Sequence, residues 1–248
     1  MIIQFEHKQK QYQADLSKPL DISIPLFSGA NNPNAFHINQ PLFEPVRVGS
    51  FIGSVQEGGA CNCENLHLNA HGNGTHTECV GHISKERVTI NQTLKHFFAI
   101  AQVISVTPQQ VTNGDYIVTR SSIEAQLNPL AEALIIRTLP NLDNKKQTNY
   151  SGNNPTYLEV SLGELLAQQN IKHLLVDLPS VDREEDEGAL ATHHAFWQYP
   201  FNTRTEATIT EFIYVDDTIA DDIYLLNIQI ASFESDASPS KPILYKLI

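Results

Sequence analysis

Residues 67–82 read HLNAHGNGTHTECVGH and hold four of the ten histidines of the chain, together with Glu78. If His76 and Glu78 lie on a β-strand, their side chains point to the same face, because strand residues alternate with period two. An imidazole nitrogen and a carboxylate oxygen placed roughly 6–7 Å apart along a strand can bind one divalent ion at about 2.0–2.2 Å. The stretch therefore predicts a metal site, although exposed or structurally hydrogen-bonded histidines in a loop remain the alternative.

The two outer histidines of this stretch lie out of reach on a straight strand. His71 has the wrong parity, so that only a bend in the glycine-containing segment after it brings it to the metal. His82 has the right parity but would lie roughly 13 Å beyond Glu78 on an extended chain. Because Gly81 permits a turn, we expect His82 to return to the site as an acid or base.

A second group of candidate ligands lies late in the chain. His193 and His194 are adjacent, and Glu211 lies within an apolar run at residues 208–215 (TITEFIYV). A carboxylate among such residues is costly to bury unless it is paired or metal-bound. Strand parity equally permits Glu211 to face solvent, so its role stays open at this point.

The apolar runs of the chain predict a mixed α/β fold. Five of them predict strands, at residues 97–107, 134–138, 172–178, 208–215 and 223–230. The order strand, helix, strand indicates at least one parallel crossover. No change of composition marks a linker, so we expect residues 1–248 to form a single domain.

The polar and helical segments complete this prediction. Residues 10–26 predict a hairpin, and two stretches, 27–48 and 141–155, predict loops. Residues 121–132 predict a short helix capped by Ser121 or Ser122. Residues 161–170 predict another, because Ser161 and Glu164 have the spacing of a capping box.

The composition excludes several classes of function. The chain has 28 acidic and 16 basic residues and a formal net charge of −12, which argues against a nucleic-acid or anionic-membrane partner. No apolar run approaches the roughly 18 residues of a membrane span, and the first ten residues lack the layout of a signal peptide. Motifs of serine hydrolases, nucleotide hydrolases, zincins and dinucleotide-binding proteins are missing.

The cysteines indicate a reducing compartment. Three of them, Cys61, Cys63 and Cys79, are too few for a disulfide scaffold. We therefore expect a cytoplasmic protein with buried free thiols.

The segment at residues 74–82 (GTHTECVGH) resembles the H-x-G-T-H-x-D-x-P-x-H signature of the metal-dependent cyclase family, which includes bacterial kynurenine formamidases. Other segments resemble further motifs of this family. They are residues 21–23 (DIS), 134–138 (LIIRT), Val176 and Asp177 with Ser180, and His193 followed by residues 210–212 (TEF). The resemblance spans most of the chain.

The resemblance implies a swivelling β/β/α domain, with mixed sheets and flanking helices, that assembles into homodimers or homotetramers. It also implies one or two Zn²⁺ or Mn²⁺ ions per subunit. His71, His76 and Glu78 would hold the first ion, and His193 and Glu211 would hold a second ion together with Glu78. His82 would be the catalytic acid or base.

The chain departs from the family pattern at several positions. Gly72 stands where the first histidine of the signature is expected. His71, one residue away, takes this role only if the glycine-bounded stretch carries a one-residue insertion. Glu78 replaces an aspartate and Val80 replaces a proline. The gap before the late glutamate is longer than usual, which leaves His194 as an alternative to His193.

The resemblance implies a metal-dependent hydrolase of a small linear amide, of the aryl-formamide type handled in tryptophan catabolism. Candidates to bind an aromatic ring are Phe36, Phe51, Phe196, Trp197 and Tyr199, although core packing explains most of them. Two alternatives remain: a metal-binding family member without activity, and a dehydratase or lactone-forming cyclase on the same metal site.

Overall fold

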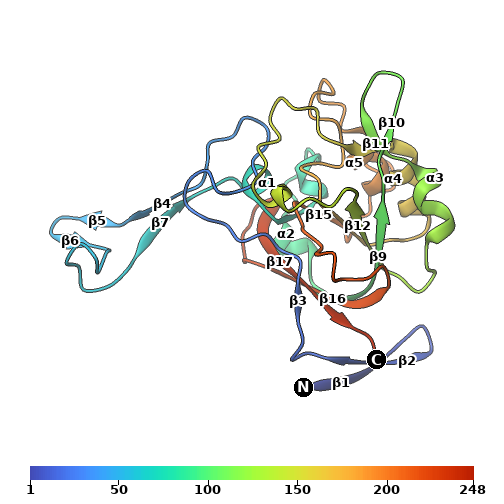
Figure 1. Cartoon of the computed structure of the whole chain (residues 1–248), viewed down its shortest axis with the longest axis horizontal. Helices are drawn as coiled ribbons and strands as arrows, with labels where there is room; N and C mark the ends of the chain where they lie inside the picture. The colour runs from blue at the N-terminus through green and yellow to red at the C-terminus, as the bar shows by residue number, and fades with distance from the viewer.

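A strongly curved mixed sheet forms the centre of the computed structural model, which describes residues 1–248 (Figure 1). The sheet has the order β16-β9-β12-β14-β15-β8-β17-β3, and β16 also pairs with β17. The first seven strands therefore close into a barrel, and β3 (Leu20–Asp21) extends β17 outside it. The barrel strands are β8 (His76–Cys79), β9 (Phe98–Val106), β12 (Ala133–Thr138), β14 (His173–Val176), β15 (Thr208–Glu211), β16 (Ile223–Ile230) and β17 (Ala237–Lys246).

The parallel crossover predicted from the sequence is present. Strands β9, β12, β14 and β15 are mutually parallel, whereas β8, β16 and β17 pair with their neighbours in antiparallel fashion. The predicted mixed α/β fold is therefore confirmed, and the sheet is closed rather than open.

Side-chain alternation on the central strands builds two apolar cores. On β12, Leu134 and Ile136 pack with the helices, whereas Ala133 and Ile135 pack inside the barrel. The side chains of β14 alternate in the same way, and Leu175 packs inside the barrel. Because both faces of these strands are covered, they appear in the sequence as continuous apolar runs.

Two helices cover the outer face of the barrel. Helix α4 (Val160–Gln168) lies against α5 (Ala191–Trp197), and a Cβ at Gly163 would lie 3.1 Å from the carbonyl oxygen of Thr192. Glycine thus permits the close approach that fixes α5, the helix that carries His193. The other short helices are α1 (Ala70–Asn73), α2 (Ile90–Thr93), α3 (Arg120–Ile123), η1 (Val80–His82), η2 (Glu124–Gln126) and η3 (Asp143–Gln147).

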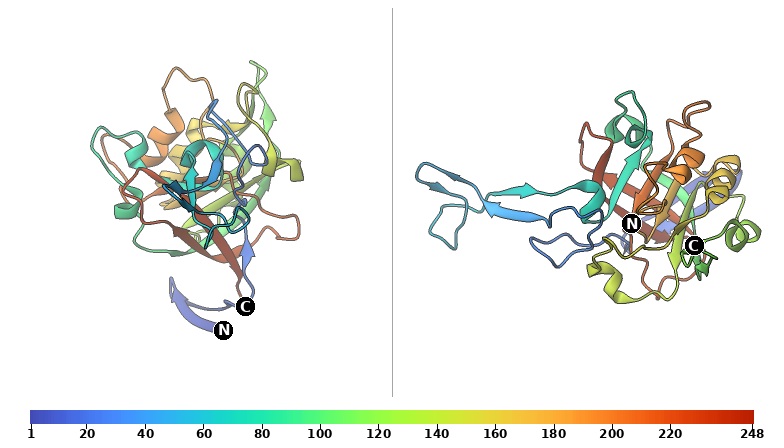
Figure 2. Two further views of the ribbon diagram at one scale, coloured as in Figure 1. Left: turned by 90° about the vertical axis from the view of Figure 1, so that its left-hand side faces the viewer. Right: turned by 90° about the horizontal axis from the view of Figure 1, so that it is seen from above.

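Besides the N-terminal hairpin, three small sheets lie apart from the barrel. One combines β10 (Gln109–Gln110), β11 (Tyr116–Val118) and β13 (Tyr157–Leu158). The other two belong to a long arm that projects from the body (Figure 2). The arm consists of β4 (Leu42–Pro45) and β7 (Glu64–His67), followed outward by the β5–β6 hairpin (Arg47–Val48 and Phe51–Ile52).

The N-terminal hairpin differs from the prediction. Strands β1 (Ile2–His7) and β2 (Lys10–Asp15) pair through a turn in which Lys8 and Gln9 both have positive φ. The expected hairpin at residues 10–26 is therefore wrong, since its second half contributes β3 to the barrel edge. The turn lacks the glycine or asparagine that usually marks such a position.

Element boundaries also differ from the predictions. The helix expected at residues 121–132 ends at Gln126 and begins after Thr119, and α4 begins after Glu159, so no predicted serine is the cap. The loop expected at residues 27–48 includes β4 and β5, the loop at 141–155 includes η3, and the strand at 208–215 ends at Glu211.

Candidate metal centre

Two neighbouring strands of the barrel supply the centre of the site. His76 and Glu78 lie on β8, as their spacing predicted, and both are fully buried. Strand β15 pairs with β8 so that Glu211 lies directly opposite His76. Cross-strand partners share a face of the sheet, and the His76 Nε2 to Glu211 Oε2 distance is 3.3 Å. The early and late candidate ligands are thus brought together by sheet register.

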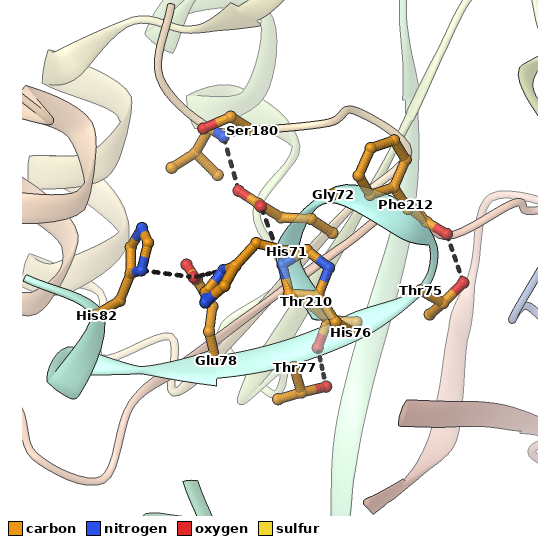
Figure 3. A network of polar contacts seen from close by, with 12 residues as sticks. His71, Gly72, Thr75, His76, Thr77, Glu78, His82, Ser180, Thr210 and Phe212 are labelled. Atoms are coloured by element: carbon orange, nitrogen blue, oxygen red, sulfur yellow. Dashed lines mark hydrogen bonds and ion pairs between the residues drawn. The ribbon is translucent and has the colours of Figure 1, made fainter. Parts of the chain in front are cut away.

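Two tight turns return His71 and His82 to the same face (Figure 3). A Cβ at Gly72 would lie 2.7 Å from Ile38 Cδ1 and 3.2 Å from the Ala35 carbonyl oxygen, so a histidine at the position where the family signature expects one would require Ile38 to move. His71, one residue earlier on α1, faces Glu78 instead. A Cβ at Gly81 would lie 1.9 Å from the Val88 carbonyl oxygen, so only glycine permits the η1 turn that returns His82.

Helix α5 supplies the last histidine. His193 is buried, and its Nε2 lies 3.0 Å from Glu78 Oε1 and 3.9 Å from Glu211 Oε1. The neighbouring His194 instead pairs its Nδ1 with the carbonyl oxygen of Tyr199. Of the two sequence alternatives, the structure therefore places His193 in the cluster and His194 outside it.

Glu78 is the centre of this cluster. Its Oε2 lies 3.1 Å from His71 Nδ1 and 3.8 Å from His82 Nδ1, while its Oε1 faces His193. Two triads of ligand atoms that lie within 4.8 Å of one another share it: His71 with His76, and His82 with His193. All six predicted site residues are thus adjacent in space.

Hydrogen bonds at the far side of each ring orient the histidines. His76 Nδ1 donates to the Gly74 carbonyl oxygen at 3.0 Å, His193 Nδ1 donates to Asp182 at 2.6 Å, and His71 Nε2 donates to Asp236 at 2.8 Å. In a neutral imidazole the other nitrogen then carries a lone pair. These lone pairs face the carboxylates of Glu78 and Glu211.

This donor set fits a divalent cation. His76 Nε2 and Glu78 Oε2 are buried without any hydrogen-bond partner, which is costly unless another group satisfies them. Two ligands at about 2.0–2.2 Å from one ion, at angles of about 90–110°, lie about 3.0–3.5 Å apart. The distances from Glu78 to His193 and to His71, 3.0 and 3.1 Å, fall in this range.

The charges of the cluster also favour a bound cation. Glu78, Glu211, Asp182 and Asp236 form their ion pairs only with histidines, never with lysine or arginine. The excess negative charge therefore favours any cation, whether proton or metal ion.

The histidine pKa values reflect this excess. Burial opposes a positive charge on His71, but its contacts with Asp236 and Glu78 outweigh burial and raise its pKa to about 10. For His193, burial is likewise outweighed, by Glu78 and Asp182, and the pKa is raised to about 10. Burial alone would raise the pKa of Glu78, yet the facing histidines His82 and His193 hold it well below its usual range. A divalent ion would replace these protons.

Sequence reasoning missed two acidic residues. Asp182 lies just before an acidic run at residues 184–187, and such a run is typical of a solvated surface. Asp236 precedes β17 in a polar turn. Neither has a periodicity or a spacing that marks it, because each reaches the cluster only through the folded chain.

Some residues singled out in the sequence lie elsewhere. Asp177 accepts hydrogen bonds from Thr138 and Lys145, outside the cluster. Among the aromatic candidates, Phe196 and Trp197 belong to the core as expected. Trp197 also flanks the cluster, because its ring lies 5.4 Å from that of His193. Phe212, which was not among the candidates, flanks His76 with ring centroids 6.2 Å apart.

The cysteine prediction is partly wrong. Cys79 is buried, but Cys61 and Cys63 are exposed on the arm. The apolar pattern that buries a cysteine is missing there, because the arm has no core of its own.

Comparison with known proteins identifies the family. Residues 14–183 match the model of the family described as "Putative cyclase". The chain belongs to this cyclase family. A kynurenine formamidase of Bacillus thuringiensis (strain Al Hakam) is 22% identical over 231 residues, which cover 93% of this chain and 95% of that protein. A kynurenine formamidase of Bacillus anthracis is 21% identical over the same length.

Solved structures share the cyclase fold. An isatin hydrolase bound to the product analogue thioisatinate superposes with a TM-score of 0.70 at 13% identity, covering 92% of each chain. A protein described as a potential metal-dependent hydrolase with cyclase activity gives a TM-score of 0.65 at 15% identity, covering 92% of this chain and 97% of that one. None of the helices of the chain combines the length and the hydropathy that a membrane-spanning helix needs.

Proposed function

We propose that this cyclase-family chain is a metal-dependent hydrolase of small linear amides of the aryl-formamide type, similar to kynurenine formamidases. The observation that carries the proposal is the buried Glu78 carboxylate, which is surrounded by oriented histidine lone pairs and has an unsatisfied oxygen. The match to kynurenine formamidases over 93% of the chain supports the choice of substrate class.

The residues that would hold the metal divide into two sets around Glu78. His71, His76 and Glu78 would hold one Zn²⁺ or Mn²⁺ ion, and Glu78, His193 and Glu211 would hold a second. When bound, such an ion polarises the amide carbonyl and lowers the pKa of a water ligand from about 15.7 to about 7.

His82 would move the protons of the reaction. It lies at the accessible side of the cluster, with 28% of its side chain exposed, and its ring is 5.4 Å from that of His193. It accepts a proton from the attacking water while the water oxygen bonds to the amide carbon. It then donates this proton to the amine nitrogen as the C–N bond breaks, which releases the free amine and formic acid; the acid then loses its proton to solvent as formate.

The direct test uses metal-free and metal-loaded protein with N-formylkynurenine, formanilide and isatin. We expect turnover of the linear amides that a chelator removes and that Zn²⁺ or Mn²⁺ restores. Stoichiometric metal binding without turnover would instead indicate a non-catalytic member of the family. Opening of isatin alone would indicate a cyclic amide substrate, like that of the isatin hydrolases.

We also propose that the chain forms a homodimer or homotetramer and acts on a small molecule rather than on nucleic acid or a membrane. The net charge of −12 supports the second statement. The arm supports the first, because a two-stranded ribbon that exposes apolar side chains has no core to stabilise it alone. The exposed Cys61 and Cys63 fit the reducing cytoplasm.

A further inference from the structure

Asp236 lies beside the cluster although it is far from the other site residues in sequence. It precedes β17, and its carbonyl oxygen accepts a hydrogen bond from the backbone N–H of Cys79 at 3.0 Å. The next residue, Ala237, is the register partner of Glu78. The barrel itself therefore holds the Asp236 backbone next to the centre of the site.

One oxygen of Asp236 contacts two histidines. Its Oδ2 lies 2.8 Å from His71 Nε2 and 3.3 Å from His82 Nδ1. The two rings stack with centroids 4.3 Å apart and an interplanar angle of 29°. Its other oxygen, Oδ1, accepts a hydrogen bond from the Ser235 hydroxyl at 3.1 Å. The carboxylate is thus fixed on both sides.

We propose that Asp236 is a positioning residue that sets which ring nitrogen of both His71 and His82 carries the proton. A carboxylate only accepts hydrogen bonds, so each histidine must present an N–H to it. His71 then keeps its proton on Nε2 and directs the Nδ1 lone pair at Glu78. His82 keeps its proton on Nδ1 and is left with Nε2 as its basic nitrogen.

The geometry excludes the opposite tautomers. A proton on Nδ1 of neutral His71 would turn a lone pair toward Asp236 at 2.8 Å and remove the ligand atom that faces Glu78. A proton on Nε2 of neutral His82 would place its Nδ1 lone pair against the same carboxylate oxygen. One side chain therefore prepares a metal ligand and a proton acceptor together, as outer partners of metal-bound histidines do.

This inference rests on the proposed function for its catalytic meaning, but its first test requires no activity. Long-range ¹H–¹⁵N spectra of the Zn²⁺-loaded wild-type protein, with His82 assigned by comparison with His82→Ala, report the protonated nitrogen directly. We expect His82 to carry its proton on Nδ1 at neutral pH. A proton on Nε2, or an averaged mixture of tautomers, would overturn the proposal.

A second test compares Asp236→Asn with Glu234→Gln. Both variants remove one negative charge from the same segment, but Glu234 contacts Thr89, Asn91 and Gln92 rather than the cluster. For Asp236→Asn we expect zinc affinity, measured by chelator competition, to fall about 10–100-fold. We expect kcat to fall about 100-fold or more while KM changes less than about twofold.

The control defines the remaining outcomes. Glu234→Gln should retain wild-type zinc affinity and kcat. Unchanged zinc affinity in folded Asp236→Asn would contradict the role of Asp236 toward His71, and an unchanged kcat would contradict its role toward His82. If no substrate is turned over, the proposed function fails, and the spectra and zinc affinity still decide the role of Asp236.

Discussion

The cluster around Glu78 buries charge, whereas the β4–β7 arm exposes apolar side chains. Glu78 and His76 are completely inaccessible to solvent, while Val48 and Leu66 on the arm are 69% and 59% exposed. The cluster lies on strands that are covered on both faces, and the arm consists of two strands with no second layer (Figure 2).

The two regions therefore favour different partners: the cluster favours a cation, and the arm favours an apolar surface. Buried carboxylates without lysine or arginine are costly unless a cation is bound. Apolar side chains on a projecting ribbon favour contact with another apolar surface. A bound cation would therefore stabilise the cluster, whereas contact with another apolar surface would stabilise the arm. Variants in each region should affect different measurements.

Glu78→Gln should have the largest effect, because it removes the charge that both proposed ion sites share. We expect stoichiometric metal binding to be lost and turnover to fall by more than about 10³-fold, since even partners outside the coordination sphere cost about 10–100-fold. Elemental analysis and initial rates measure both. Glu206→Gln on the exposed surface is the control, and a metal content equal to wild type in Glu78→Gln would contradict the proposed ligand.

His82→Ala should separate chemistry from metal binding. Loss of a general acid–base typically costs about 10²–10⁴-fold in rate, and we expect metal content to stay close to wild type. His194→Ala is the matched control, because this histidine contacts Tyr199 outside the cluster. Full activity in His82→Ala would show that another group transfers the proton.

Local periodicity predicted the parts of the site that a single strand determines. Period two placed His76 and Glu78 on one face, and the glycine at 81 indicated the turn that returns His82. The pairing of Glu211 with His76 depends on sheet register. No local pattern determines this register, so only the family resemblance connected the two segments.

Other features were beyond sequence reasoning for physical reasons. The space at position 72 is limited by Ile38 and Ala35, which are distant in the chain. Asp182 and Asp236 reach the histidines through the helix–barrel contact and the β17 register, respectively. The arm escaped prediction because its strands lack a buried face, and therefore lack the alternation that marks a strand.

His173 tests the contrast between histidines with and without a carboxylate partner. It is buried on β14, where its Nδ1 pairs with the Thr208 hydroxyl at 2.8 Å. Burial lowers its pKa from 6.5 to about 4, so protonation favours the unfolded chain. The contribution of neutral His173 to the free energy of unfolding is complete above pH 6.5. It is lost as the pH falls toward 4, by about 3 kcal/mol in total.

Denaturant unfolding between pH 7 and 4 measures this loss. We expect His173→Gln to be less stable at pH 7 but to show a shallower decline of the free energy of unfolding with falling pH. The metal-free protein is used for both chains, so that metal release does not contribute. Parallel pH dependences for the two chains would exclude His173 as the titrating group.

Leu66→Glu tests the arm and should have the smallest effect on the isolated chain. A charge on this exposed residue leaves the barrel and the cluster untouched, so we expect metal content to remain at the wild-type level. It should weaken association by about tenfold or more, because burying an unpaired charge in an interface costs more than about 1.4 kcal/mol. Light scattering over a dilution series measures the dissociation.

Leu142→Glu, at a residue 55% exposed on the body, makes the same chemical change and should leave association unchanged. Equal effects of the two substitutions would show that the arm is not the interface, and the apolar exposure of the arm would then require another partner.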